Sequence, residues 1–377
     1  MTAGSGRRFS ALIAGLAATA LLLTGCADSG HGTDSADEEQ RPALSELDAL
    51  DDPRDYEGPS TATLTDNEIA PLTHDPDQTL PVTVTSYRQD GTEEQVQITD
   101  TSRVVAVDLA GSIAASVWAL GFGDTLVGKD QSTTFPGTED IETVTSAGHT
   151  VNAETIIALA PDVVITDGTV GPRDVIEQLR DVGITVVFVN NDASFHGAEE
   201  LARQVAGVYG AAEAGDMLAD RIRQQVDSTI DQVAALAPAQ DEDRVRILFL
   251  YLRGNAGVYY MFGSESGADE LIDALGGVDV ANELGWEGMR PMTDEALVAA
   301  DPDLILTMTG GIQSVGGVDG LLEEKPAIAL TAAGEHRRIV DMDDGTILSF
   351  GPRSAEVIDA LARAVYAPHG SAGDEDR

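Results

Sequence analysis

The sequence predicts an α/β protein with two Rossmann-like lobes joined by one long connecting helix, and two observations support this fold class. From Arg103 onward, short apolar runs alternate with longer stretches of helical periodicity, as in a chain of βαβ units. Residues 154–165 and 295–306 then repeat one pattern: each begins with Glu, continues as a helix, reaches Pro-Asp seven positions later and ends in an apolar strand. One α/β unit used twice implies two similar lobes.

The expected elements begin with a hairpin, because residues 82–84 and 96–98 flank Asp90-Gly91. In the first lobe we expect strands at 103–107, 163–165 and 185–189, and helices at 111–120 and 175–181. Five apolar residues at helical spacing predict the connecting helix: Met217, Leu218, Ile222, Val226 and Ile230. The alternation resumes at 245–250, 271–275, 304–306 and 338–340, and a helix closes the fold at 354–366.

These elements set the boundaries that we predict along the chain. We assign residues 1–26 to a signal peptide, 27–80 to an acidic disordered tether, 81–210 to an N-terminal lobe, 211–239 to the connecting helix, 240–368 to a C-terminal lobe and 369–377 to a tail. Two lobes joined in this way form a cleft, and clefts between lobes are favoured ligand sites.

The first 26 residues carry the features of a lipoprotein signal peptide. Arg7 and Arg8 precede an apolar run at 11–23, too short and too early for an ordinary membrane-spanning helix, which closes in Leu23-Thr-Gly-Cys26. Cys26 is the only cysteine, so it cannot form an internal disulfide and is placed to become a lipidated N-terminus. We therefore expect a lipid-anchored protein on the extracellular face of the cell membrane; a secretory signal with an incidental cysteine is the alternative.

The charge of the chain argues against strongly anionic partners. The formal net charge is −43, and Lys129 and Lys325 are the only lysines. Nucleic acid and anionic lipid headgroups repel such a chain. Acidic residues are dense at 27–80, where few apolar residues recur at a regular spacing, so we expect no packed core there.

The strongest candidate for a binding site is the end of the apolar run Ile247-Leu-Phe-Leu-Tyr-Leu-Arg-Gly254. Tyr251 and Arg253 lie two residues apart, so on a strand they point to the same face. Open α/β sheets bind their ligands at the carboxyl ends of the strands. We therefore expect these two side chains to enter a binding site together.

Several motifs together resemble the substrate-binding proteins of iron-complex and cobalamin ABC importers. They are the lipobox, Arg103-Val-Val followed by Ala119-Leu-Gly-Phe-Gly-Asp-Thr-Leu-Val-Gly128, the repeated Glu and Pro-Asp unit, and Leu275-Gly-Gly277-Val. The resemblance covers about residues 103–366 and implies the class III substrate-binding fold with an ABC permease as partner. In that family one glutamate from each lobe docks against permease arginines, which the match assigns to Glu154 and Glu295.

The ligand follows from a narrower resemblance. Gly148-His149-Thr150 in the first lobe and Tyr251-Leu-Arg253-Gly254 in the second are similar to the haem-binding lipoproteins of Gram-positive haemin uptake systems, in which a histidine and a tyrosine bind the iron from opposite faces. This match implies that His149 and Tyr251 are the axial ligands of ferric haem, that Arg253 supports Tyr251, and that the protein acts as a monomer. Taken alone, His149 would more often be an ordinary loop histidine.

The chemistry of these residues agrees with the haem hypothesis. A free phenol has a pKa of about 10, so a tyrosine ligand must be deprotonated by the ferric ion with help from a neighbouring cation. Arginine can donate hydrogen bonds to a phenolate without losing its charge. Five residues that follow Tyr251 are candidates for haem-pocket contacts, or equally for the core: Tyr260, Trp286, Met289, Arg290 and Met292.

Other functions stay open at this point. The same fold class binds ferric siderophores and cobalamin, and a surface haem scavenger or relay would need no permease. An enzyme is not predicted. The segment from Gly123 to Asp130 is close to the sequence motif of a phosphate-binding loop. However, Asp130 replaces the required Ser or Thr, and the segment follows a helix instead of a strand.

Overall fold

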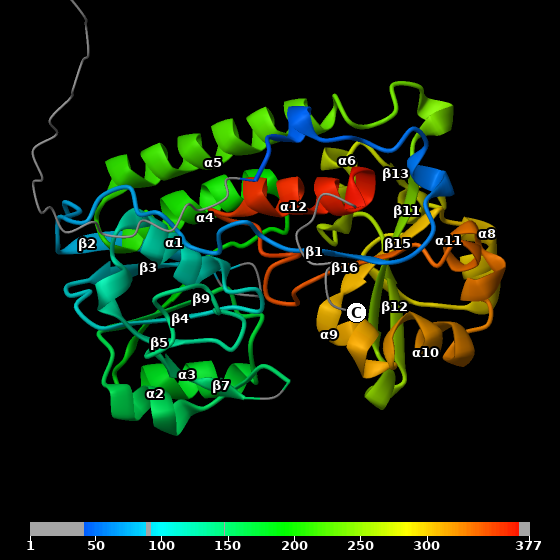
Figure 1. Cartoon of the computed structure of the whole chain (residues 1–377). Helices are drawn as coiled ribbons and strands as arrows, with labels where there is room; N and C mark the ends of the chain where they lie inside the picture. Colours follow the sequence, from blue (N-terminus) through cyan, green and yellow to red (C-terminus); the bar gives the residue numbers. More distant parts are fainter. Residues whose placement is uncertain (1–40, 88–91, 147, 369–377) are drawn as a thin grey trace, which may run out of the picture. The chain divides into compact units, whose positions relative to one another are not determined.

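The computed structural model describes residues 41–87, 92–146 and 148–368 (Figure 1). The predicted signal peptide with Cys26, the first part of the acidic segment, the Asp90-Gly91 turn and the C-terminal tail lie outside the described residues.

The N-terminal lobe is a parallel sheet with helices on both faces. In the described residues its strand order is β10-β9-β4-β5-β6. The strands are β4 (Val104–Val107), β5 (Leu126–Lys129), β6 (Glu142–Thr143), β9 (Val163–Thr166) and β10 (Thr185–Phe188). The helices are α1 (Ser112–Leu120), η3 (Gly123–Thr125), α2 (Ala153–Leu159), α3 (Arg173–Asp181) and α4 (Phe195–Val208). Two antiparallel hairpins complete the lobe: β2 (Val82–Tyr87) with β3 (Glu93–Ile98), as predicted, and β7 (Thr145–Ser146) with β8 (Thr150–Val151).

The C-terminal lobe is a mixed sheet, whose strand order in the described residues is β1-β16-β15-β11-β12-β14, with β13 also paired to β11. The strands are β1 (Ser60–Ala62), β11 (Arg246–Arg253), β12 (Val258–Phe262), β13 (Val278–Asp279), β14 (Met289–Pro291), β15 (Leu304–Met308) and β16 (Ile339–Met342). The helices are η4 (Asp241–Asp243), η5 (Gly254–Ala256), α6 (Ala268–Ala274), α7 (Val280–Glu283), α8 (Asp294–Ala300), α9 (Thr309–Ser314), α10 (Gly317–Glu324), η6 (Ile328–Leu330), α11 (Ala332–Glu335) and α12 (Ser354–Tyr366).

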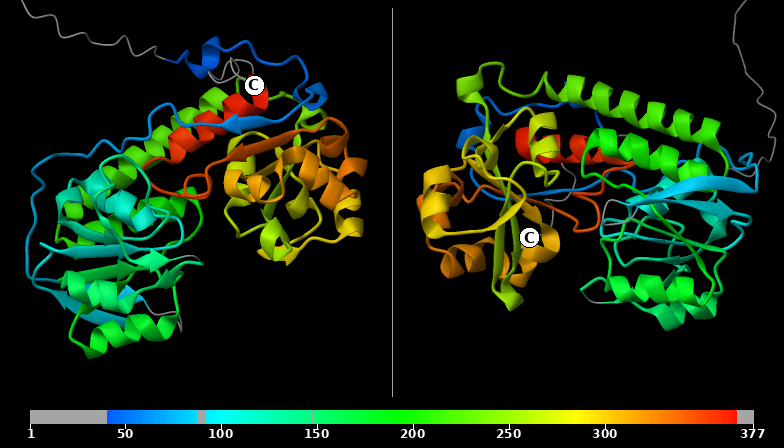
Figure 2. Two further views of the ribbon diagram at one scale, coloured as in Figure 1. Left: turned by 60° about the horizontal axis from the view of Figure 1, so that its bottom comes forward. Right: turned by 180° about the vertical axis from the view of Figure 1, so that it is seen from behind.

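The connecting helix is α5 (Ala212–Val233), which at 22 residues is roughly 33 Å long. It packs against α4 of the N-terminal lobe and against α12, which itself covers β1 and β16 of the C-terminal lobe (Figure 1, Figure 2). The apolar stripe that the sequence predicts is its buried face, with Leu218, Ile222 and Val226. None of the helices in the described ranges is long and apolar enough to cross a membrane. The two α/β lobes and the long helix that joins them confirm the predicted fold class.

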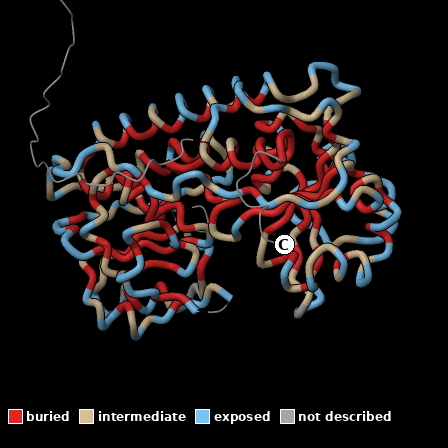
Figure 3. Tube along the Cα trace, viewed as in Figure 1, coloured by how far each residue is buried: buried red, intermediate tan, exposed pale blue. Residues whose placement is uncertain are grey.

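Buried residues fill the interior of both lobes (Figure 3). Each sheet separates two apolar layers, because successive side chains of a strand point to opposite faces. In β4, Val104 and Ala106 face one layer, whereas Val105 and Val107 face the other. In β11, Ile247 and Phe249 belong to the layer that continues through both lobes, and Leu248, Leu250 and Leu252 belong to the outer layer of the C-terminal lobe. Every second side chain after Phe249 therefore lies on the same face of β11 as Phe249, towards the apolar layer that continues through both lobes.

The internal repeat seen in the sequence is repeated in atomic detail. In the first lobe the carboxylate of Asp162, just after Pro161, accepts from the backbone nitrogen of Arg103 at 2.9 Å, and the Arg103 side chain donates to the carbonyl of Leu159 at the end of α2. In the second lobe, Asp303 accepts from the Arg246 nitrogen at 2.9 Å, and Arg246 donates to Ala300 at the end of α8. The Pro-Asp step thus links each helix to the next strand of its sheet, and the two lobes are built from one unit.

The expectation of a disordered tether is wrong for residues 41–80. Leu44 is buried, and β1 pairs in parallel with β16 at the edge of the C-terminal sheet. Arg338 lies over the ring of Tyr56 and donates to the Ser60 hydroxyl. The segment then reaches the N-terminal lobe, where the Leu72 nitrogen donates to the Ala119 carbonyl. The many acidic residues of this segment led to the wrong expectation. A few apolar residues are enough to pack the segment against a core that the rest of the chain provides.

We expect Leu44→Ala to lower the free energy of unfolding by about 2 to 4 kcal/mol, because Leu44 is only 1% exposed and its loss leaves a cavity. Denaturant unfolding measures this change, and Ser45→Ala on the exposed side of the same turn is the control. Equal stability of the two variants would mean that this segment does not fold onto the body in solution.

Candidate functional site

Tyr251 and Arg253 lie at the carboxyl end of β11, side by side on one face as the strand period predicts. The ring of Tyr251 stacks on Phe262 of β12, with centroids 5.8 Å apart and planes 18° apart. Phe262 in turn stacks on Phe249, with centroids 5.1 Å apart. An aromatic row therefore runs along β11 and β12 and ends at Tyr251, which is partly exposed.

Arg253 contacts Tyr251 in a different way from the one that we predict from the sequence. Its guanidinium carbon lies 4.6 Å from the centroid of the Tyr251 ring, so the contact is of the cation–π type with the ring face. Nη1 donates to the carbonyl of Leu252 at 2.9 Å, and Nη2 donates to the carboxylate of Asp344 at 2.7 Å. In the described residues the guanidinium thus has partners other than the Tyr251 hydroxyl.

His149 lies in the turn between β7 and β8. Its φ of 57° is left-handed, as is the φ of 77° of Gly148 before it. The amide nitrogen of Gln131 lies 3.2 Å from Nε2 of His149. Nδ1 is buried and has no hydrogen-bond partner among the described residues. The imidazole is therefore held from one side and has an unused nitrogen.

A chain of contacts joins His149 to Tyr251 across the two lobes. Gln131 contacts His149 and is followed by Ser132, and a Cβ placed on Gly345 would lie only 2.8 Å from the Ser132 carbonyl oxygen. Gly345 follows Asp344, which pairs with Arg253. We refer to His149, Gln131, Tyr251, Arg253 and Asp344 as the interlobe site.

The charge of Arg253 acts on His149. Burial lowers the pKa of His149 below its ordinary value, and the positive charge of Arg253 lowers that pKa further. Both effects keep the imidazole neutral near pH 7, which leaves a nitrogen lone pair free for a metal ion. His149 and Arg253 are thus electrostatically coupled although they come from opposite lobes.

Two buried carboxylates fix the loops of the first lobe that lead to this site. Asp108 follows β4 and accepts from the backbone nitrogens of Ala110 and Ile113, each at 2.8 Å. Asp130 follows β5 and accepts from the nitrogen of Ser132 at 2.8 Å. Burial raises the pKa of Asp130 to about 6, and burial next to Asp130 raises the pKa of Asp108 well above its ordinary value. Asp130 therefore fixes the turn that contains Gln131. The segment that resembles a phosphate-binding loop thus has a structural role.

The five predicted pocket contacts fall on two different faces. Tyr260 is paired with Tyr251 across β11 and β12, and Met289 is paired with Phe262 across β12 and β14, so both lie on the Tyr251 face. Met289 is 62% exposed. Arg290 is paired with Met261, which points to the opposite face. Trp286 and Met292 pack against that outer apolar layer. Phe262, which is not among these five residues, contacts Tyr251 directly.

Glu154 and Glu295 occupy equivalent places in the repeated unit. Each lies in the first turn of its helix, α2 or α8, and each is exposed. Three residues further along, on the same side of each helix, Ile157 is 43% exposed and Val298 is 44% exposed. Each lobe therefore presents a carboxylate beside an exposed branched apolar side chain.

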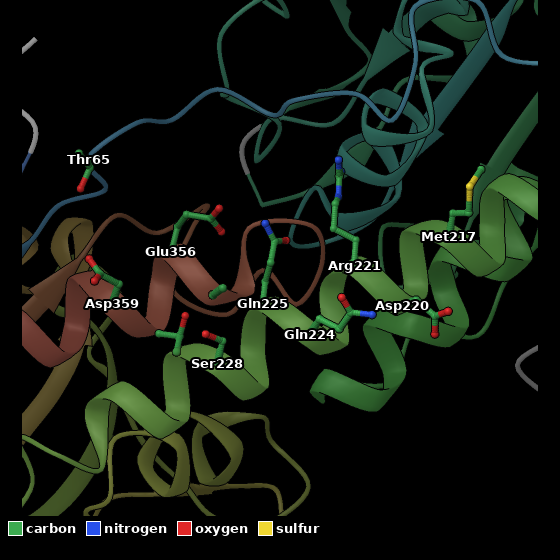
Figure 4. A pocket seen from close by; sticks show the side chains of 11 residues that line it. Thr65, Met217, Asp220, Arg221, Gln224, Gln225, Ser228, Glu356 and Asp359 are labelled. Carbon is green, nitrogen blue, oxygen red and sulfur yellow. The ribbon is translucent and has the colours of Figure 1, made fainter. Parts of the chain in front are cut away.

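Two cavities of the described residues lie away from the interlobe site. A groove of about 660 Å³ runs between α5 and α12, where Arg221 is accompanied by Asp220, Glu356 and Asp359 (Figure 4). A second cavity of about 510 Å³ is lined by Trp118 and His74, among others. Neither contains a residue that the sequence predicts for the binding site.

The chain matches known proteins over most of its length. A model of the periplasmic binding protein family matches residues 105–346. The solved structure of the haem-binding protein HmuT is 37% identical in sequence, covers 84% of this chain and 99% of its own, and superposes with a TM-score of 0.77. Structures of variants of HmuT also match, in which an arginine, a histidine or a tyrosine is replaced by alanine; the tyrosine and the arginine are two positions apart.

Two curated relatives differ in what their names say. A substrate-binding lipoprotein of an ABC transporter, YvrC of Bacillus subtilis, is 28% identical over 293 residues, which are 77% of this chain and 87% of that protein. A cobalamin-binding protein of Halobacterium salinarum is 27% identical over 264 residues, 69% of each chain.

We expect Arg253→Met to raise the pKa of His149, because one of its two causes is removed, while burial keeps that pKa below the ordinary value of about 6.5. An NMR titration of the imidazole in the ligand-free protein measures the change. Arg290→Met, which removes an exposed arginine from the opposite face of the sheet, should leave the His149 pKa unchanged. The same His149 pKa in the wild-type and Arg253→Met proteins would show that the two side chains do not approach each other in solution.

Proposed function

Because this chain belongs to the periplasmic binding protein family, we propose that it binds ferric haem between its two lobes and delivers it to an ABC permease. His149 and Tyr251 are the axial ligands in this proposal, and Arg253 supports Tyr251. The observation that carries the proposal is the meeting of the two lobes at Arg253, which lies over the Tyr251 ring and whose charge lowers the pKa of His149.

The described side chains suit an iron porphyrin. Among the described residues, Nδ1 of His149 is a buried nitrogen without a hydrogen-bond partner, and the ring of Tyr251 lies beside the fixed positive charge of Arg253. Phenolate is a hard ligand that favours ferric iron, and imidazole is a common ligand of haem iron. Phe262, Tyr260 and Met289 line the same face of the sheet and would contact the flat apolar ring.

Similar proteins support the same ligand. HmuT is described as haem-binding, and its studied variants affect a histidine and a Tyr-x-Arg pair. This chain has His149 and the Tyr251-Leu-Arg253 pair at the interlobe site. The Halobacterium relative keeps cobalamin as the second candidate ligand. Cobalamin carries axial ligands of its own on the cobalt, so it would not require the Tyr251 phenolate. A ferric siderophore would favour several arginines around an anionic chelate and would not need His149.

Delivery to a permease is supported by the repeated unit. The exposed glutamates Glu154 and Glu295, each with an apolar neighbour one turn away, give two equivalent surfaces that a partner with two equivalent sites would bind. Lipidation of Cys26 would hold the protein at the membrane beside that partner, as the name of the Bacillus relative suggests for that protein. A surface haem relay without a permease is the alternative.

For ferric haem binding, we expect Tyr251→Phe to raise the Kd about 100-fold and His149→Ala about tenfold, because the phenolate is the charged ligand. Absorption titration measures both constants and should show a saturable one-to-one complex in the wild type, with a phenolate charge-transfer band that Tyr251→Phe lacks. Tyr260→Phe is the matched control, since it removes a hydroxyl from the paired position on β12. Wild-type affinity in both ligand variants would remove the assignment, and saturable binding of cobalamin alone would replace the ligand.

For delivery, we expect Glu154→Lys and Glu295→Lys each to lower the rate of haem transfer into permease-containing proteoliposomes by about tenfold, because a like charge is brought against the permease. Haem affinity of the soluble protein should stay unchanged. Glu213→Lys on exposed α5 is the control for the altered net charge. Unchanged transfer by both lobe variants would favour a relay that needs no permease.

A further inference from the structure

Asp344 is a charged residue of the interlobe site that the proposed ligand set does not use. It lies in the loop after β16, and its Oδ2 accepts a hydrogen bond from Nη2 of Arg253 at 2.7 Å. Its other oxygen, Oδ1, accepts from the backbone nitrogen of Gly310 at 2.6 Å. Both carboxylate oxygens therefore have hydrogen-bond partners, and these fix the orientation of the Asp344 carboxylate towards Arg253.

The sheet places these partners at one edge. The strands β16, β15 and β11 are neighbours and parallel, so their carboxyl ends meet, and Asp344, Gly310 and Arg253 follow or end these three strands in turn. A Cβ on Gly310 would come within 2.8 Å of the Asp344 carboxylate, so a glycine at this point permits the close approach. Asp344 thus reaches past the end of β15 to hold a side chain on β11.

The loop that carries Asp344 is itself held in place. Asp343 accepts from the backbone nitrogen of Gly345 at 3.1 Å and from the hydroxyl of Thr346 at 3.0 Å. On the other side, Gly345 approaches the Ser132 carbonyl of the N-terminal lobe, and Ser132 is fixed by Asp130. The position of Asp344 therefore depends on contacts from both lobes.

We propose that Asp344 is a positioning residue that holds the Arg253 guanidinium against the face of the Tyr251 ring. Without this pair, Arg253 has a long flexible side chain at a partly exposed strand end, where many rotamers compete. Side chains of Asp344 and Arg253 are 36% and 32% exposed, so the pair adds little to folding stability and its effect is on geometry. The consequence for haem, that Asp344 acts on the iron through Arg253 and Tyr251, rests on the proposed function.

The positioning role is tested first in the ligand-free protein by NMR. Protons of Arg253 over the Tyr251 ring should be shielded, and Asp344→Asn should move them towards the shifts of an exposed arginine, because a neutral amide makes a weaker hydrogen bond to the guanidinium. Asp319→Asn, which alters a carboxylate paired with Arg337 instead of Arg253, should leave them shielded. Unchanged Arg253 shifts in Asp344→Asn would overturn the proposal, whatever ligand the protein binds.

The functional part is tested by a double-mutant cycle on ferric haem binding. Asp344→Asn should shift the phenolate charge-transfer band in the same direction as Arg253→Met but by less, and should have no further effect when Arg253 is already Met. Additive effects, or a band shift in the opposite direction, would overturn an action through Arg253. If the wild type shows no haem spectrum at all, the proposed function fails, and the NMR comparison still decides the role of Asp344.

Discussion

The alternation of side chains along β11 is the constraint on which the site depends. Leu248, Leu250 and Leu252 are buried in the outer apolar layer of the C-terminal lobe, so the register of the strand cannot slip by one residue without exposing all three. Phe249 is buried in the opposite layer. Tyr251 and Arg253 continue the Phe249 face to the point where the strand ends and the apolar cover stops. The same pattern that stabilises the sheet therefore places a phenol and a guanidinium together.

His149, which we propose as the partner of this pair, lies in the other lobe, and several independent contacts join the two lobes. Helix α5 packs on helices of both lobes, residues 41–80 cross from β16 to α1, and the loop after β16 contacts Ser132. In the first lobe, burial of Asp108 and Asp130 is unfavourable for the charged carboxylates and is offset by backbone N–H groups that they hold. These bonds fix the loops of the first lobe that lead to Gln131, which contacts His149.

Sequence patterns predicted the parts of the structure that depend on local periodicity. The two lobes, the connecting helix, the repeated Pro-Asp unit and the shared face of Tyr251 and Arg253 all follow from spacings along the chain. The interactions that were missed join distant segments: Asp344 with Arg253, Gln131 with His149, Phe262 with Tyr251. Residues 41–80 were misjudged for the same reason, because their strand is stabilised by β16, about 280 residues later. Arg290, Trp286 and Met292 could not be assigned to a face before the register of β12 and β14 was known.

A crystal structure of the mature protein loaded with ferric haem would test the central claim most directly. We expect one porphyrin between the lobes, with its iron bound by the Tyr251 oxygen on one face and by an imidazole nitrogen of His149 on the other, and with Arg253 beside the Tyr251 oxygen or ring. Iron bound by other side chains, or haem bound in the groove between α5 and α12, would contradict the assignment of the interlobe site as the haem site.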